Sequence, residues 1–193
     1  MIETILLVTL TALYLFMFIT RNLLVMKRIG QPVRKADLLV RSAIILTTFC
    51  FIVTIFSTSD TWYDFMGKIA FLRSPVLSHI GLLLFLISII LCWIFSSQLK
   101  DSWRVGVLED QKTTLIKAGI YAYVRNPYFV SYFIMYLSLL LIRPSIILLV
   151  LVILPVIVFH KMVLKEEAYL LQTHGKEYEE YKSKTGRYLP RFR

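Results

Sequence analysis

The apolar residues of the chain are gathered into long runs that polar segments separate. Five such runs cover residues 4–20, 38–57, 76–95, 127–142 and 145–160. A helix needs about 20 mostly apolar residues to cross a bilayer, so the pattern predicts five membrane-spanning helices, the last two a little short. Only Arg143 and Pro144 separate those two. Because proline interrupts a helix, this predicts a tight helical hairpin, and the alternative is a re-entrant pair that does not fully cross.

The tail beyond the last apolar run also has helical character. Leu164, Ala168 and Leu171 keep helical spacing up to Gly175. The stretch "KEYEEYKSK" then predicts a short second helix, with Tyr178 and Tyr181 on one face and its end at Gly186. We therefore expect an all-α fold that forms a single membrane domain over residues 1–193. Three spans lie in residues 1–98, and residues 99–193 hold the last two spans and the candidate functional residues.

Composition supports an integral membrane protein. Hydrophobic residues make up 58% of the 193 residues, which leaves too little polar surface to cover a soluble globule. The start "MIETILLVTL" has no basic residue before its apolar core and no cleavage site after it. We expect it to be a retained first span.

The net charge of +10 is distributed unevenly along the chain. The first loop holds Arg21, Lys27, Arg28, Arg34, Lys35 and Arg41, and the long polar segment holds Lys100, Arg104, Lys112, Lys117 and Arg125. Eight more basic residues follow from Lys161 onward, against Lys68, Arg73 and Arg143 on the other side. The positive-inside rule then predicts an external N-terminus, with both loops and the C-terminal helices in the cytoplasm. Topology explains the charge without a nucleic-acid partner.

Several kinds of site have no support in the sequence. Cys50 and Cys92 lie within apolar runs, and the three histidines are far apart, so no metal site is predicted. No GxG motif occurs, and a dinucleotide loop of the Rossmann type is therefore not expected.

The stretch "YVRNPYF" has two interpretations. Asn126 can cap a helix that begins at Pro127, with Arg125 as an ordinary interfacial anchor. The same helix start also offers free N–H groups and positive partial charge, to which Arg125 adds a bidentate anion donor. Glu166 and Glu167 are similarly ambiguous: they can form a solvated helix face paired with lysine, or hold a cation or act as a base.

Two stretches, "LIKAGIYAYVRNPYFVSYF" and "KEEAYLLQTHGKEYEEYKSKTGRYLPRF", resemble the isoprenylcysteine carboxyl methyltransferase family and its phospholipid-methyltransferase-like relatives, especially small prokaryotic members. The family's G-x-Y-x-x-x-R-[HN]-P, E-E, G-x-E-Y-x-x-Y and G-R-x-x-P motifs match Gly119, Tyr121, Arg125, Asn126, Pro127, Glu166, Glu167, Gly175, Glu177, Tyr178, Tyr181, Gly186, Arg187 and Pro190. Asn126 replaces a frequent histidine, so we give this position no acid–base role.

This resemblance implies a methyltransferase that uses S-adenosylmethionine, bound on the cytoplasmic side of an inner or plasma membrane. It implies cofactor binding by Trp103, Gly119, Tyr121, Arg125, Asn126, Pro127, Glu166 and Glu167, and catalytic roles for Arg125, Glu166 and Glu167. The acceptor it implies is lipophilic and enters from the bilayer, foremost a prenylcysteine carboxylate and alternatively a phospholipid amine. A sterol-reductase-like enzyme that binds NADPH, and a membrane binding protein without activity, are the other readings.

Overall fold

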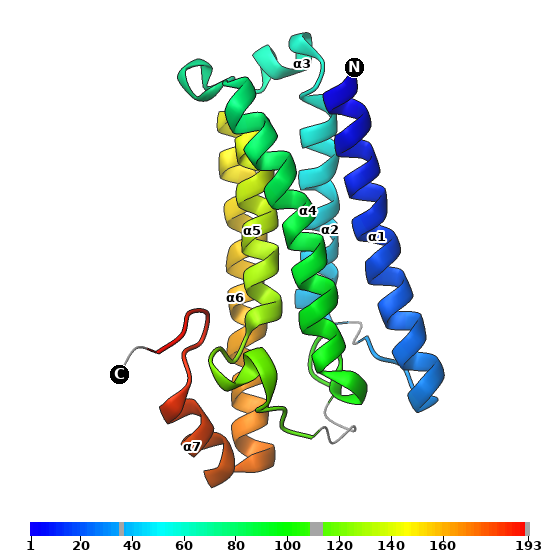
Figure 1. Cartoon of the computed structure of the whole chain (residues 1–193), viewed down its shortest axis with the longest axis vertical. Coiled ribbons are helices and arrows are strands. Elements are labelled where there is room, and N and C mark those ends of the chain that lie inside the picture. The colour runs from blue at the N-terminus through cyan, green and yellow to red at the C-terminus, as the bar shows by residue number, and fades with distance from the viewer. Residues whose placement is uncertain (35–36, 109–113, 192–193) are drawn as a thin grey trace.

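The computed structural model describes residues 1–34, 37–108 and 114–191 as an all-α protein, without β-strands in those ranges. Five long helices run side by side along the molecule (Figure 1): α1 (Ile2–Ile29), α2 (Leu38–Phe56), α4 (Pro75–Gln98), α5 (Pro127–Ile142) and α6 (Ile146–His174). The N-terminal end of the bundle carries α3 (Asp60–Phe65) and η1 (Ala70–Leu72). The opposite end, called here the α7 end, carries η2 (Lys100–Ser102), η3 (Gly119–Ala122) and α7 (Lys176–Lys184).

Two helices extend beyond the apolar runs that predicted them. The helix over the first run continues to Ile29, where Gly30 adopts φ 68° and donates its N–H to the Met26 carbonyl. The helix over the last run continues from Ile146 to His174 as α6. Polar residues mark where a membrane span ends, but the helix can continue past them until a capping or helix-breaking residue such as glycine. The glutamate pair is therefore carried on the same rigid helix as the last apolar run.

In the described parts of the chain, four helices are long and apolar enough to cross a membrane, namely α1, α2, α4 and α6, as expected for an integral membrane protein. The fifth, α5, has 16 residues and so a length of about 24 Å, less than the roughly 30 Å of a bilayer's hydrocarbon core. Five complete crossings and a final transmembrane hairpin stay predictions. The short tail helix is confirmed as α7, with Tyr178 and Tyr181 both buried on one face.

A partly buried ion pair joins distant parts of the chain at the N-terminal end. Arg143 follows α5 and is only 8% exposed, and its guanidinium lies 2.9 Å from the carboxylate of Glu3 on α1. The guanidinium also lies 5.3 Å from the ring centre of Tyr63. The predicted turn at Arg143 and Pro144 is therefore also a tether for the start of α1.

The closest helix packing is between α4 and α5, while α2 packs along α6. Gly81 of α4 permits that approach: a Cβ there would lie 2.8 Å from the Ser138 carbonyl oxygen and 2.7 Å from a side-chain carbon of Ile142. Overpacking a close interface costs about 1–3 kcal/mol. We expect Gly81→Ala to lower the unfolding midpoint in detergent by several degrees. Leu83→Ala, at an exposed position of the same helix, should change it little, and equal midpoints for both variants would contradict this packing.

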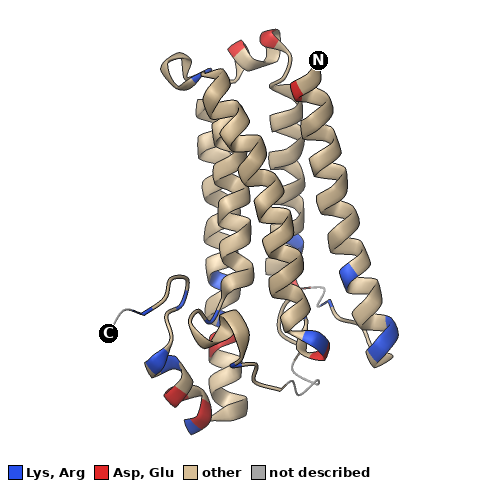
Figure 2. Cartoon of the chain, viewed as in Figure 1, with Lys and Arg blue, Asp and Glu red and all other residues tan. Residues whose placement is uncertain are grey.

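Most of the lysine and arginine residues lie at the α7 end of the bundle (Figure 2). The described parts of the first loop, the long polar segment and the tail all lie there, as their shared charge predicted. Lys35, Lys112 and Arg193 belong to the same expectation but lie outside the described residues.

Candidate functional site

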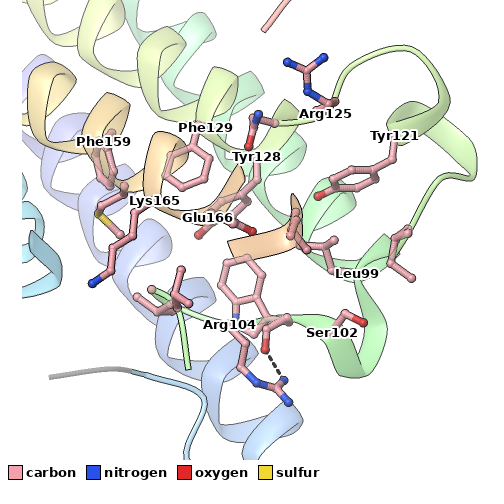
Figure 3. Close-up of a pocket in the computed structure, with 18 of the residues that line it drawn as sticks. Leu99, Ser102, Arg104, Tyr121, Arg125, Tyr128, Phe129, Phe159, Lys165 and Glu166 are labelled. Atoms are coloured by element: carbon pink, nitrogen blue, oxygen red, sulfur yellow. Dashed lines mark hydrogen bonds between the residues drawn. The ribbon is translucent and has the colours of Figure 1, made fainter. Parts of the chain in front are cut away.

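A pocket at the α7 end lies between the segment that follows α4, the start of α5, the second half of α6, and α7. Parts of the chain that are far apart in sequence supply its polar side chains, which include those of Asp37, Arg104, Tyr121, Arg125, Glu166 and Tyr178. Figure 3 shows the Tyr121 ring and the Glu166 carboxylate pointing into the pocket, whereas the Arg125 guanidinium points away from it.

The start of α5 differs from a simple helix cap. Pro127 occupies the first helical turn as expected, but the side chain of Asn126 makes no capping hydrogen bond to the helix. Instead its Nδ2 donates to Glu167 Oε1 at 3.0 Å. The interpretation that Asn126 caps α5 with its side chain was therefore wrong. The buried carboxylate of Glu167 accepts a charge-assisted hydrogen bond from the Asn126 amide, and this contact orients the side chain toward α6.

Glu167 is a buried carboxylate surrounded by donors. It is 6% exposed, and its Oε1 accepts from Arg125 Nε at 3.1 Å as well as from Asn126. Its Oε2 accepts from two nitrogens of Arg187, at 3.1 and 2.9 Å. Burial raises the pKa of Glu167, but the Arg187 hydrogen bonds and the Arg125 charge outweigh it, and the net pKa lies below the ordinary value. Glu167 is thus ionised and fully engaged.

The C-terminal segment is built into the same corner. Backbone hydrogen bonds link Arg125 N–H to the Gly186 carbonyl at 2.9 Å and Asn126 N–H to the Arg187 carbonyl at 3.1 Å. The Arg125 guanidinium also donates to the Lys182 and Thr185 carbonyls. A Cβ on Gly186 would lie 1.7 Å from the Leu189 carbonyl oxygen, so only glycine permits this turn. Arg125 is therefore held by the protein rather than extended toward the pocket.

Glu166 has the opposite environment from its neighbour. It lies on the pocket wall, partly buried, and has no hydrogen-bond or ion-pair partner among the described residues. It lies beyond the apolar part of α6, after Lys161 and Lys165. Burial, and then the charge of Glu167, raise the pKa of Glu166 to about 7. The two adjacent glutamates therefore differ. Glu167 is ionised and hydrogen-bonded within the protein, whereas Glu166 has a pKa near neutral pH and no partner among the described residues.

Aromatic side chains form another wall of the pocket. The Trp103 and Tyr128 ring centres lie 4.5 Å apart, as do those of Tyr132 and Phe159. Trp103 is fixed by a hydrogen bond from its Nε1 to Asn22 Oδ1 on α1, at 3.0 Å. Aromatic faces attract cations, and an unpaired carboxylate on the adjoining wall adds to that attraction.

The structure brings together most of the residues predicted from the sequence. Trp103, Tyr121, Arg125, Asn126 and Glu166 line the pocket. Gly119, Pro127 and Glu167 lie behind the lining and support it: Gly119 adopts φ 62° and is packed against Gln98. Sequence reasoning did not assign pocket positions to Tyr128, Phe129, Tyr132, Phe159, Met162, Lys165, Tyr178 and Tyr181. For the aromatic residues of α5 and α6 the signal was only their helical spacing, which is equally typical of a packed core. Tyr178 and Tyr181 had a further signal, because they match the family's G-x-E-Y-x-x-Y motif.

A second, largely apolar crevice adjoins the pocket. Its lining comes mainly from α1 and α2, within the apolar part of the bundle: Tyr14, Leu15, Phe18, Val40, Ala43, Ile44, Thr47, Thr48 and Phe51. Six residues line both the pocket and the crevice, namely Phe18, Val40, Val105, Tyr132, Phe159 and Met162. The pocket that holds the charged side chains therefore shares part of its wall with an apolar crevice between helices.

These features define an all-α membrane protein with a pocket where polar and apolar surroundings meet, and the described residues include no group of three or more His, Cys, Asp or Glu able to hold a metal. Residues 77–177, or 101 of 193, match the sequence model of the phospholipid methyltransferase family. The chain belongs to this family of membrane methyltransferases, which confirms the resemblance at the family level. A search of curated proteins found no significant match.

Proposed function

We propose that the protein is an S-adenosylmethionine-dependent methyltransferase that acts on a lipophilic acceptor. The observation that supports this most is that the pocket, with its charged and polar side chains, directly adjoins the apolar crevice and shares lining residues with it. A transfer between a water-soluble donor and a lipid-soluble acceptor needs such a junction, because the two reactants approach from different solvents. Membership of the phospholipid methyltransferase family supports the same reaction class.

The residues of the pocket suit this cofactor. S-adenosylmethionine supplies an electrophilic methyl group on a sulfonium, together with an ammonium group and an adenine ring. Trp103 and Tyr128 provide aromatic faces for a cation or an adenine ring, and Glu166 provides an unpaired carboxylate for a positive charge. We assign cofactor binding to these residues and to Tyr121 and Asn126. Arg125 borders the pocket and acts through Glu167, and Gly119, Pro127 and Glu167 shape the wall behind the lining.

Methyl transfer from a sulfonium is an in-line displacement, so the main tasks of the chain are alignment of the reactants and exclusion of water. The first candidate acceptor is a prenylcysteine carboxylate, supported by the motif resemblance. Its negative charge and the donor's positive charge neutralise each other, and no base is required. The second candidate is a lipid amine, and Glu166 favours it: a carboxylate with a pKa of about 7 can take up the proton that the amine must lose.

The proposal includes an orientation. With its basic α7 end in the cytoplasm (Figure 2), the pocket would receive its donor from the side where such cofactors are made, and the N-terminus would lie outside. The acceptor would enter from the bilayer through the crevice between α1 and α2.

The test is binding of S-adenosylmethionine to the purified protein in detergent, measured by calorimetry, with NADPH as the competing ligand. We expect saturable binding of S-adenosylmethionine and no binding of NADPH. Arg125→Ala should weaken the binding of S-adenosylmethionine at least tenfold, because Arg125 holds Glu167, which in turn holds Asn126 at the pocket. Arg28→Ala is the matched control, because Arg28 makes an exposed ion pair with Asp101 at the same end of the bundle. Binding of NADPH instead would favour a reductase. Binding of neither ligand by folded protein would leave a membrane protein without this cofactor.

A further inference from the structure

Tyr178 combines deep burial with an unused polar group. It lies on α7, is 1% exposed, and forms part of the pocket wall. Its hydroxyl is buried and has no hydrogen-bond partner among the described residues. A few other buried polar atoms in the described chain also lack a partner, such as those of Thr11 and His174, but none of their residues lines the pocket.

An unpartnered buried hydroxyl is costly, because it has lost its hydrogen bonds to water without replacement. Native proteins keep such groups rarely, and each one calls for an explanation. Tyr181 shows that the same helix face can satisfy a hydroxyl: it lies one turn further along, also lines the pocket, and donates to the Tyr121 carbonyl at 2.6 Å. The missing hydrogen bond is therefore a property of the position of Tyr178 and not of this helix face in general.

The neighbourhood of Tyr178 determines in which form its hydroxyl can act. Burial, and then the negative charge of Glu167, raise the pKa of Tyr178 above its ordinary value, although Arg125 acts in the other direction. The phenol therefore stays protonated at physiological pH. A protonated hydroxyl on a pocket wall offers a hydrogen-bond donor to whatever occupies the pocket.

We propose that Tyr178 is a ligand-binding residue of this pocket, and that its hydroxyl donates a hydrogen bond to an oxygen or nitrogen acceptor atom of the bound methyl donor. This inference rests on the proposed function, and it adds α7 to the parts of the chain that contact the donor. It also explains why an otherwise unfavourable group is tolerated: the hydroxyl is satisfied only when the pocket is filled.

The experiment compares Tyr178→Phe with two matched variants, using calorimetric titration with S-adenosylmethionine and thermal unfolding without ligand. Tyr178→Phe removes only the unpartnered oxygen. We expect its affinity to fall about three- to tenfold, the worth of one neutral hydrogen bond, while its unfolding midpoint without ligand stays equal or rises. Tyr181→Phe should instead lower that midpoint, because the Tyr121 carbonyl loses its donor.

Tyr188→Phe is the control for affinity. Tyr188 lies outside the pocket lining, and its hydroxyl is bonded to His160 at 2.8 Å, so its loss should leave donor affinity unchanged. The proposal is overturned if wild type and Tyr178→Phe bind the donor equally, or if Tyr178→Phe lowers the ligand-free midpoint, since the hydroxyl would then be satisfied within the protein. Failure of wild-type protein to bind S-adenosylmethionine at all is a different result, which overturns the proposed function itself.

Discussion

The Glu167→Gln variant is expected to lose donor binding together with a large part of the protein's stability. Both carboxylate oxygens of Glu167 accept hydrogen bonds, and all the donors are N–H groups of Arg125, Asn126 and Arg187. A glutamine amide would turn its NH₂ group toward one of these donors and would leave the Arg125 guanidinium buried without its counter-charge. The side chains of Arg125 and Glu167 are only 8% and 7% exposed, so solvent cannot compensate.

Breaking a buried ion pair by removing one partner costs about 3–5 kcal/mol, and we expect a loss of that size for Glu167→Gln in unfolding measured in detergent. S-adenosylmethionine affinity should fall at least tenfold, because the start of α5 loses its anchor on α6. The control is Glu177→Gln, which breaks the exposed ion pair between Glu177 on α7 and Lys117. This variant should leave stability and donor affinity nearly unchanged. Wild-type stability in the Glu167 variant would show that the cluster is not formed.

The same cluster predicts how stability responds to acid. The folded-state pKa of Glu167 lies below its ordinary value, so its stabilising contribution is complete above the unfolded pKa of about 4.3. That contribution is lost as the pH falls through the lower folded value. Wild-type protein should therefore lose stability more steeply below about pH 4 than Glu167→Gln, and parallel pH curves would contradict this assignment.

The helical fold could be predicted because bilayer-spanning segments need long apolar runs, which are visible in the sequence. Helix ends could not be predicted equally well. The helix of the first apolar run continues to Ile29, because Gly30 rather than the first charged residue ends it. The end of the last long helix before Gly175 was predicted, because apolar residues keep helical spacing up to that glycine. A hydropathy pattern reports where lipid stops, whereas a helix responds to backbone caps.

The candidate site, too, could be predicted only in part from the sequence. The motif residues Trp103, Tyr121, Arg125, Asn126 and Glu166 do meet in one pocket, although only the structure shows that Arg125 points away from it. The side chain of Asn126 was expected to make a local contact and instead makes a long-range one. Local rules at a helix start cannot foresee a buried carboxylate supplied by α6, 41 residues further along the chain.

The contrast between the two glutamates leads to the second large expected effect, which concerns Glu166. With a lipid amine as the acceptor, we expect Glu166→Gln to lower turnover at least a hundredfold, within the range typical of a lost acid–base group. The fold should be retained, because Glu166 has no partner to lose among the described residues. The measurement is transfer of radiolabelled methyl groups to lipid extracts, over pH 5.5 to 9 for wild type and variant.

The pH dependence provides the sign of the effect. With a folded pKa of about 7, Glu166 becomes charged as the pH rises through neutrality, so wild-type turnover should rise over that interval and the variant should lack the rise. Stability should change in the opposite direction: between the unfolded pKa of about 4.3 and pH 7 the folded protein binds more protons, and wild type loses stability relative to Glu166→Gln as the pH increases. If the variant shows the predicted stability difference but keeps near-normal turnover, Glu166 is ionisable as described but is not the base. That outcome favours a carboxylate acceptor, whose methylation needs none.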